Sequence, residues 1–501
     1  MITSGLCRLL YRAGFRVAPF KAQNMSLNSF VTPEGGEIGR AQALQAEACG
    51  IPPHVDMNPI LLKPESDSRS QIIVQGKVFA TREARAYFAR NRDSELFQAV
   101  EGSYNRLASQ YEILVIEGAG SAAEVNLRDR DLVNWPVVEM ADAKVVLVGD
   151  IDRGGVFAQV VGTLDLITPE ERARVCGLVI NKFRGDRALF ADGVRFLHER
   201  TGIPVLGVLP FLRDLALDQE DSLDVEVRRQ VAFAEHRVNI AVVLLPHMSN
   251  FTDFNMLAQE ADVVLRYVAA PAEAAGADVV IIPGSKSTLA DLAYLREKGF
   301  GVVVRDHARS SREVVGICGG YQMLGRRIAD PDGVETGGEA DGLGLLHTTT
   351  VMMSDKITEQ VEASALHIED AGPVAVRGYF IHMGRTDPGP HRPCFQLNGR
   401  TDQSHDHAHA DSFEARRSDG AVREDGLVWG TYIHGLFDRP QFRRAWLNRA
   451  RCRKGLEPIE LACSQQVNDT RWHVLDRWAD HVDQHLDLTP IWTILRSQTG
   501  R

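Results

Sequence analysis

The chain lacks long apolar runs and paired cysteines. Its longest apolar stretches, such as IAVVLLP and VVIIP, are far shorter than the roughly 20 residues that a membrane-spanning helix needs. The seven cysteines are scattered and include no C-x-x-C pair, which argues against a disulfide framework and against a zinc site. The first residues also lack the charged-then-apolar order of a signal peptide. We therefore expect a cytoplasmic protein with no membrane partner.

Basic side chains are fewer than acidic ones in this chain. Lys and Arg number 56 against 67 Asp and Glu, which gives a formal charge of -11 and no reason to expect a nucleic-acid partner. The hydrophobic content of 44% and the charged content of 25% are typical of a soluble α/β protein. With 501 residues the chain is too long for one core, and about two to four domains are expected.

Short Val- and Ile-rich runs alternate with helical stretches in the first part of the chain. They are FRVAPF, YEILVIEGAG, AKVVLVGDID, VCGLVINKF and IPVLGVLP. Runs of this length without polar alternation are typical of parallel strands that are buried on both faces by helices. The sequence thus predicts a doubly wound α/β domain over residues 1–225, followed by a linker at 226–237.

A second series of strand-like runs predicts another α/β domain over residues 238–445. It includes VNIAVVLLP, ADVVIIP, EVVGI, VAVRGYFIHMGRT and GLVWGTYIHGLF. Strands dominate its later half, which favours a mixed sheet over a purely parallel one. Residues 446–501 read as a helical tail, and its amphipathic stretch RWHVLDRWADHVDQHLD is expected to pack on this second domain.

The strongest chemical signal is EVVGICGGYQMLG. A strand runs into Cys318, two glycines permit a sharp turn, and a helix is expected to start at Tyr321. Such a turn lifts the thiol above the sheet and points a helix N-terminus at it, which favours the thiolate. Cys318 alone would fit a small buried apolar residue equally well. His434, which closes a strand in GTYIHGLF, adds a candidate general base, so the pair rather than either residue predicts nucleophilic catalysis.

These motifs resemble a known family. GICGGYQMLG, PGSKST, YFIHMGRT and GTYIHGLF resemble the glutamine amidotransferase domain of the cobyric acid synthases, which belong to the triad-type glutaminases. KAQNMSLNS, GGEIGRAQALQA, DMNPILLKP, EGAGSAAEVNLRDRD, DIDRGGVF and NKFRGD resemble the synthetase domain of the same family, in the same order. The resemblance implies ATP-dependent amidation of the b, d, e and g carboxylates of adenosylcobyrinic acid a,c-diamide, a corrinoid, with glutamine as nitrogen donor.

The resemblance also implies roles in the glutaminase half. Cys318 matches the nucleophile and His434 the catalytic histidine. The expected oxyanion donors are backbone N–H groups of Gly284, Ser285 and Gly319. Many triad glutaminases carry a glutamate two residues after the histidine, whereas Leu436 stands there in this chain. The third member of the triad is therefore left unassigned.

The N-terminal half resembles P-loop proteins of the dethiobiotin synthetase type. That resemblance implies ATP and Mg²⁺, with Glu37 and Glu117 as metal ligands. Glu117 follows a predicted parallel strand, where a phosphate-bound metal would lie, although an acid that caps a helix would also fit. Lys21 is a candidate contact for the γ-phosphate or a substrate carboxylate, and a solvated lysine is the alternative.

Four further candidate positions belong to the same half of the chain, one by resemblance and three by their place in the sequence. Asn181 closes the strand VCGLVIN and resembles the residue that contacts adenine in this fold, although Asn at a strand end is often only a turn former. DIDRGG offers Asp150, Asp152 and Arg153 for the corrin side, with a simple Asx turn as the alternative.

The chain contains no G-x-x-x-x-G-K-[ST] phosphate loop. GSKST lies in the second domain without the leading spacing and matches the oxyanion segment instead. In the family a strand and a glycine-rich loop precede the helix that begins this chain, so ATP-dependent amidation is expected to be weak or absent. We expect Met1 to be an internal start rather than the end of a genuinely truncated protein, because GGEIGRAQALQA, EGAGS and NKFRGD are intact.

Two alternatives remain open at this stage. The first is an a,c-diamide synthase, which shares both domains but amidates other carboxylates. The second is a non-catalytic scaffold with a glutaminase fold, which an impaired nucleotide site would permit.

Overall fold

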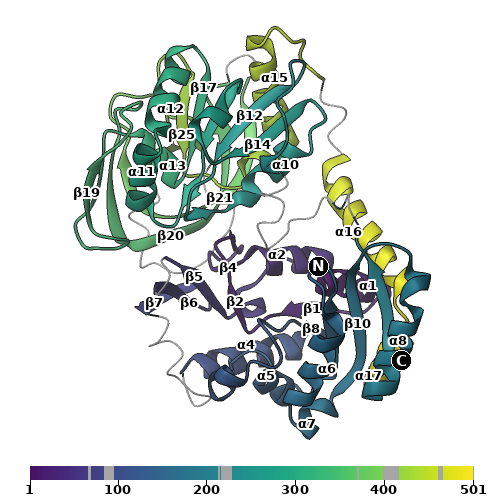
Figure 1. Ribbon diagram of the computed structural model, residues 1–501. Helices are drawn as coiled ribbons and strands as arrows, with labels where there is room; N and C mark the ends of the chain where they lie inside the picture. Colours follow the sequence, from purple (N-terminus) through teal and green to yellow (C-terminus); the bar gives the residue numbers. More distant parts are fainter. Residues whose placement is uncertain are drawn as a thin grey trace.

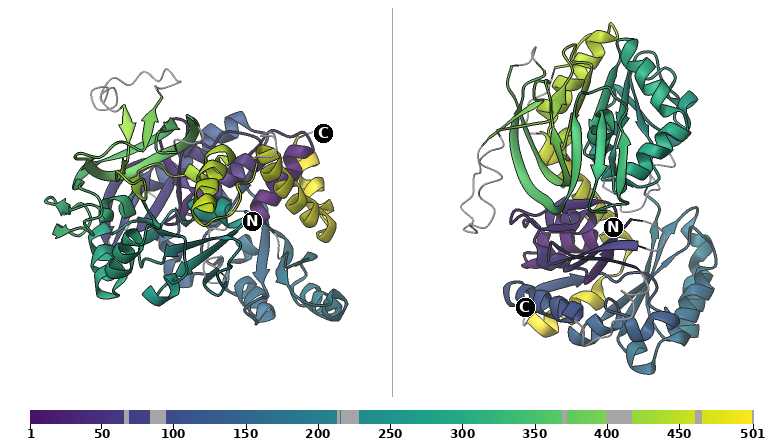
Figure 2. Two further views of the ribbon diagram at one scale, coloured as in Figure 1. Left: turned by 90° about the horizontal axis from the view of Figure 1, so that it is seen from above. Right: turned by 90° about the vertical axis from the view of Figure 1, so that its left-hand side faces the viewer.

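The computed structural model describes residues 1–65, 69–83, 95–212, 215, 228–368, 372–398, 417–460 and 466–499. The chain forms two stacked α/β lobes, with the N-terminal lobe at the bottom of Figure 1 and the second lobe at the top. The right-hand view of Figure 2 shows the same stacking from the side. Of the predicted linker, residues 228–237 are described, while 226 and 227 lie outside the described residues.

The first lobe comprises the elements up to Pro210. Its strands are β1 (Val17–Phe20), β2 (Gln23–Met25), β3 (Ser29–Val31), β4 (Glu37–Gly39), β5 (Ile60–Pro64), β6 (Arg69–Val74), β7 (Lys77–Glu83), β8 (Ile113–Ile116), β9 (Val145–Asp150), β10 (Val175–Phe183) and β11 (Val205–Pro210). Its helices are α1 (Ile2–Arg12), α2 (Arg40–Ala48), α4 (Glu95–Gln110), α5 (Trp135–Met140), α6 (Val156–Leu166), α7 (Pro169–Arg172) and α8 (Ala191–Thr201).

The predicted parallel strands of this lobe form two separate groups. β1 pairs with β8, and β9, β10 and β11 form a second parallel group. In the described residues β9 pairs only with β10, so one edge of β9 is open and Val148 is 42% exposed. The expectation that these strands are buried on both faces is therefore wrong for β9. A mostly antiparallel sheet of β2, β5, β6 and β7 extends toward the upper lobe.

The second lobe follows from Val238. Its strands are β12 (Val238–Val243), β13 (Met248–Ser249), β14 (Val263–Val268), β15 (Val279–Ile282), β16 (Gly284–Ser285), β17 (Glu313–Ile317), β18 (Arg327–Asp330), β19 (Gly338–Asp341), β20 (Thr349–Ala365), β21 (Val374–Asp387), β22 (Phe395–Leu397), β23 (Ser418–Asp419), β24 (Ala421–Val422) and β25 (Val428–Thr431). Its helices include η4 (Phe251–Phe254), α10 (Asn255–Ala258), α11 (Thr288–Glu297), α12 (Phe300–Arg309), α13 (Gly319–Leu324), η7 (Leu436–Asp438) and α15 (Pro440–Arg453).

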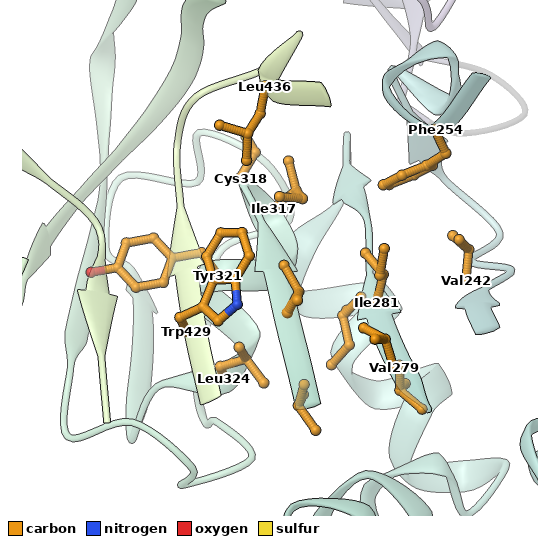
Figure 3. Close-up of a cluster of buried hydrophobic side chains, with 14 of the residues drawn as sticks. Val242, Phe254, Val279, Ile281, Ile317, Cys318, Tyr321, Leu324, Trp429 and Leu436 are labelled. Atoms are coloured by element: carbon orange, nitrogen blue, oxygen red, sulfur yellow. The ribbon is translucent and has the colours of Figure 1, made fainter. Parts of the chain in front are cut away.

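Two sheets build this lobe. The central one has the order β14-β12-β15-β17-β25-β24 and is parallel except for β24, so the expected mixed sheet is present. The second is organised around the long antiparallel hairpin of β20 and β21. Continuous apolar runs place the strands of the central sheet in a fully buried core, which Figure 3 shows beneath Cys318.

The C-terminal tail is divided between the lobes. α15 belongs to the second lobe, where Trp446 is fully buried. The tail continues as α16 (Gln466–His485) and α17 (Thr489–Thr499), which return to the first lobe, where α16 packs on α1 and β11 (Figure 1). Arg8 of α1 binds Asp476 at 2.8 Å, and Trp478 donates to the carbonyl of Met1 at 2.8 Å. The expectation that the amphipathic stretch packs on the second domain is thus wrong.

None of the helices in the described ranges combines the length and the apolar character that crossing a bilayer requires.

Candidate active site

Cys318 lies at the sharp turn between β17 and α13. Its backbone has a φ of 52° and a ψ of -108°, and α13 begins at Gly319, two residues before the predicted start. The turn needs glycine two residues after Cys318, because a Cβ on Gly320 would lie 1.9 Å from the carbonyl oxygen of Ile282. The backbone N–H of Cys318 donates to Thr431 of the neighbouring strand at 2.8 Å. Figure 3 shows Cys318 at the end of its strand, beside Ile317.

His434 follows β25 and reaches toward Cys318. Its ring Nδ1 lies 2.6 Å from Oδ2 of Asp253, while the other carboxylate oxygen accepts the backbone N–H of Gly435 at 2.9 Å. Both side chains are buried. The carboxylate is therefore held at two points and fixes the orientation of the imidazole, with Nδ1 as the protonated nitrogen of the hydrogen bond.

The charge state of His434 follows from these neighbours. Burial alone would lower the pKa of the imidazole, but the charge and the hydrogen bond of Asp253, helped by Cys318, raise the pKa of His434 to about 10. His434 is thus an imidazolium at neutral pH. A cation beside a cysteine sulfur favours the thiolate, which is the nucleophilic form.

The predicted oxyanion residues surround the same centre. A Cβ on Gly319 would lie 2.9 Å from the backbone nitrogen of Ser285, and one on Gly284 would lie 3.3 Å from Cε1 of His434. The turn is anchored by Asp291, whose Oδ2 accepts the hydroxyl of Ser285 at 2.6 Å. The structure therefore brings all three glycine and serine positions together with Cys318 and His434.

A cavity beside Cys318 is lined by residues of both lobes. From the second lobe it is lined by Cys318, Gln322, Lys286, Glu335 and Lys356, among others, and from the first lobe by Lys63. Side chains of both lobes thus share one cavity with the thiol.

Buried charges join the lobes at this cavity. Oε1 of Glu37 accepts from Lys63 at 2.8 Å, and Oε2 accepts from Lys356 of β20, which also donates to Gln71 at 3.1 Å. Burial lowers the pKa of Lys356 to about 7, against the attraction of Glu37. Nearby, Lys286 forms an ion pair with Glu65 of the first lobe at 3.0 Å.

These contacts bear on the metal role predicted for Glu37. Both of its carboxylate oxygens are occupied by lysines, its side chain is 1% exposed, and one of those lysines comes from the other lobe. A carboxylate neutralised by two ammonium groups is a poor ligand for a divalent cation, because the lysines would repel the metal. The geometry argues against Glu37 as a Mg²⁺ ligand and makes it a contact between the lobes.

Lys21 and Glu117 are brought together at the ends of β1 and β8. Lys21 donates to Oε1 of Glu117 at 2.8 Å, and Gln45 of α2 donates to Oε2 at 2.6 Å. Burial opposes the shift, but Lys21 lowers the pKa of Glu117 below its ordinary value. Within the described ranges, no group of three or more His, Cys, Asp or Glu side chains is arranged to hold a metal.

The remaining predicted residues lie at the ends of β9 and β10. Asn181 is the register partner of Asp150. Asp150 accepts from Lys182 at 2.8 Å and from the backbone N–H of Asp152 at 2.9 Å, so the Asx turn considered from the sequence is present. Asp152 and Arg153 are exposed at this edge.

Asp253, Glu335 and Lys356 carry charge at the site, but the sequence motifs did not single them out. Asp253 lies 181 residues before His434, in FTDFN, and its only sequence signal is an acid shortly after the first strand of the second lobe. Tyr379 was also missed. Its ring stacks on His434 with centroids 5.6 Å apart, and its hydroxyl donates to the carbonyl of Ser29 in the first lobe at 3.0 Å.

Comparison with known proteins finds two domains in this chain. Residues 1–225 match a family described as the CobQ/CobB/MinD/ParA nucleotide binding domain, and residues 239–442 match the CobB/CobQ-like glutamine amidotransferase domain. The chain is 46% identical over 505 residues to a cobyric acid synthase of Syntrophobacter fumaroxidans, covering 99% of this chain and 96% of that protein. It is 48% identical over 504 residues to the cobyric acid synthase of Citrobacter koseri, with coverage of 99% and 96%. The chain therefore belongs to the cobyric acid synthase family.

Proposed function

We propose that this protein transfers ammonia from glutamine to carboxylates of a corrinoid in cobalamin biosynthesis. The proposed substrates are adenosylcobyrinic acid a,c-diamide, ATP and glutamine, and the proposed product is adenosylcobyric acid with new amides at b, d, e and g. The observation that carries the glutaminase half is the buried contact of His434 with Asp253 beside the Cys318 turn. The high identity to cobyric acid synthases over 99% of the chain supports this function over the a,c-diamide synthase alternative.

The glutaminase half would work by covalent catalysis. The Cys318 thiolate attacks the carboxamide carbon of glutamine, and backbone N–H groups of Gly319 and Ser285 stabilise the oxyanion. The His434 imidazolium gives a proton to the departing nitrogen, so ammonia leaves and a glutamyl thioester remains. Neutral His434 then takes a proton from water, whose oxygen attacks the thioester and releases glutamate. Asp253 serves as the third member of the triad by holding Nδ1.

The same cavity is the proposed start of the route that ammonia takes toward the first lobe. Lys63 of the first lobe and Cys318 of the second both line it, and the ion pairs of Glu37 with Lys63 and Lys356 join the lobes there. Ammonia released at the thioester would then meet the corrin carboxylate in the first lobe without passing through bulk water.

The first lobe would activate that carboxylate with ATP. Glu117 at the end of β8 stays the proposed Mg²⁺ ligand and would exchange its contacts with Lys21 and Gln45 for the metal, while Lys21 would contact a phosphate or the substrate. The metal, when bound, would neutralise phosphate charge. Asn181 near adenine, and Asp150, Asp152 and Arg153 near the corrin, remain proposals of the same kind.

The test separates the two half-reactions. Cys318→Ser is expected to lower glutamate release from glutamine by on the order of 10³-fold or more, because the nucleophile is lost. Amidation supported by ammonium chloride should proceed at the same rate in Cys318→Ser and in the wild type. Cys452→Ser changes an exposed free cysteine and serves as the matched control. Glutamate release by Cys318→Ser at the wild-type rate would refute the assignment.

A further inference from the structure

The backbone of His434 is held by the second sheet of its lobe. β25 ends at Thr431, before the histidine is reached. The backbone N–H of His434 then donates to the carbonyl of Tyr379 on β21 at 2.9 Å, and the N–H of Tyr379 donates to the carbonyl of His434 at 3.1 Å. This is an antiparallel pair of hydrogen bonds between one residue on each side. The position of the His434 backbone therefore follows that of Tyr379.

Gly378 allows the two segments to approach this closely. A Cβ at this position would lie 2.2 Å from the carbonyl oxygen of His434 and 2.6 Å from a side-chain carbon of Ile433. A residue with a side chain would push His434 away from β21, so the strand needs glycine beside Tyr379. The contact between β21 and His434 thus depends on the sequence of the strand as well as on the histidine.

The side chain of Tyr379 also covers one face of the imidazole. The two rings are nearly parallel, with an interplanar angle of 21° and centroids 5.6 Å apart. Asp253 holds Nδ1 within the plane of the imidazole, but a hydrogen bond tolerates some bending and leaves the tilt of that plane less restricted. A ring packed on the face limits the tilt. The negative face of an aromatic ring also favours a cation above it.

Tyr379 is itself held in place by the first lobe. Its side chain is buried, and its hydroxyl donates to the carbonyl of Ser29 at 3.0 Å. The ring of Phe30 packs against it, with centroids 5.3 Å apart. A side chain that is bonded at its tip and packed along its ring cannot turn away from His434, so it can serve as a fixed support for the imidazole.

We propose that Tyr379 is a positioning residue for His434, because it fixes the backbone and the ring plane of the histidine for proton transfer beside Cys318. The proposal rests on the proposed function of the second lobe as a glutaminase. Tyr379 acts through the histidine rather than on glutamine. Loss of its ring should therefore slow turnover and leave the binding of glutamine nearly unchanged.

The stacked ring should also stabilise the imidazolium. Burial opposes the charged form of His434, but Asp253 of η4 and Cys318 raise the pKa of His434 to about 10. Both groups remain when Tyr379 is changed, so a fall in the pKa would report the loss of the tyrosine ring. Because the ring favours the cation, its removal should move the titration of His434 to lower pH.

The experiment compares the wild type with Tyr379→Leu, Tyr379→Phe and Tyr294→Leu. The first variant removes the ring and keeps the backbone that pairs with His434, whereas the second keeps the ring and removes only the hydroxyl. Tyr294 is a half-buried tyrosine on α11 of the same lobe and is the matched control. Glutamate release gives kcat and KM for glutamine. The histidine C–H resonances of the full chain give the titration of His434, whose signal is assigned by its loss in His434→Gln.

The expected result is a loss of turnover in one variant alone. Tyr379→Leu should lower kcat by about 10- to 100-fold, the effect of a misplaced catalytic group, while KM stays within about threefold of the wild type. The titration midpoint of His434 should fall by about 0.5–1.5 pH units. Tyr379→Phe should keep kcat within about fivefold and should keep the wild-type midpoint, because its ring can still stack on the imidazole. Tyr294→Leu should match the wild type in both measurements.

Three results would overturn the proposal. A wild-type kcat in Tyr379→Leu would make Tyr379 a merely structural residue, even if the melting temperature fell. Equal losses of kcat in Tyr379→Leu and Tyr379→Phe would assign the effect to the hydroxyl bond with Ser29 and not to the ring. A rise in KM as large as the fall in kcat would place Tyr379 in the binding of glutamine.

Two safeguards keep the test decisive. Tyr379→Met has a flexible apolar side chain that fills more of the space, and it provides the same comparison if the leucine variant does not fold. A wild-type protein that released no glutamate would refute the proposed function. The titration of His434 needs no turnover, so an unchanged midpoint in Tyr379→Leu would then overturn the role of Tyr379 and a lower one would support it.

Discussion

The contact between Asp253 and His434 gives the sharpest prediction of the structure. In Asp253→Asn the new amide cannot reproduce both bonds of the carboxylate. If its oxygen accepts from His434, its NH₂ group faces the N–H of Gly435, where two donors meet. If the amide turns over, its NH₂ group faces Nδ1, and the neutral imidazole then carries its proton on Nε2, so Nδ1 has no proton to donate. The first orientation loses the bond to Gly435, and the second misplaces the proton that His434 must move.

The size of the effect follows from the pKa of His434. Its rise from 6.5 to about 10 corresponds to about 5 kcal/mol of preference for the imidazolium. Once the charge of Asp253 is removed, burial dominates, and the pKa of His434 should fall below 6.5. Wild-type His434 therefore keeps its proton through neutral pH, whereas in the variant it should lose its charge at a lower pH. We expect glutaminase kcat to fall by on the order of 10³-fold at pH 8.

The assay is glutamate release measured from pH 5 to pH 9. The loss should be smallest at pH 5, where the doubly protonated ring has no tautomer to misplace, and should grow as the pH rises. Asp306→Asn replaces an exposed acid in the same lobe and should leave the profile unchanged. A variant with wild-type kcat at pH 8, or with a loss that is the same at every pH, would refute the role assigned to Asp253.

Two further predictions concern packing and coupling. Gly320→Ala should lower the melting temperature strongly, because its Cβ would lie 1.9 Å from the carbonyl oxygen of Ile282. The control Gly301→Ala in α12 meets its nearest neighbour at 3.4 Å and should be neutral or stabilising. Equal melting temperatures of the two variants would contradict this view of the turn. Lys356→Met removes one half of the buried ion pair with Glu37, a change that typically lowers the free energy of unfolding by about 3–5 kcal/mol. The variant should still release glutamate from glutamine, but it should form less amide for each glutamate released. The control Lys298→Met alters a half-exposed lysine. An unchanged ratio of amide to glutamate in Lys356→Met would show that the ion pairs of Glu37 do not guide ammonia.

Local sequence patterns predicted the Cys318 turn well. A buried apolar run followed by two glycines has few ways to continue, so the strand, the turn and the helix could be placed from the sequence alone. The strand that ends before His434 was predicted from its own short apolar run in GLVWGTYIHGLF. The orientation of His434 could not be predicted, because Asp253 reaches it from a different part of the chain and no spacing rule connects the two.

The misplaced expectations share a physical cause. An amphipathic pattern shows that one face of α16 is buried but does not show against what, and that face packs on α1 and β11 rather than on the second lobe. Likewise, an acid in GGEIGR shows a carboxylate but not its partners. Glu37 meets Lys356 across 319 residues of chain, and that lysine makes it a contact between lobes.

The glutaminase centre is completed by contacts that cross the lobes. The backbone N–H of Ser29 donates to Asn250 at 3.0 Å, and Asn250 begins the turn that carries Asp253. The carbonyl of Ser29 accepts a hydrogen bond from the hydroxyl of Tyr379, whose ring stacks on His434. One residue of β3 thus contacts the supports of both the acid and the base. Because buried hydrogen bonds resist stretching, a movement of β3 would be felt at His434 and Asp253 together. The segment that carries Asp253 and the ring that stacks on His434 are therefore both anchored to Ser29 of the first lobe.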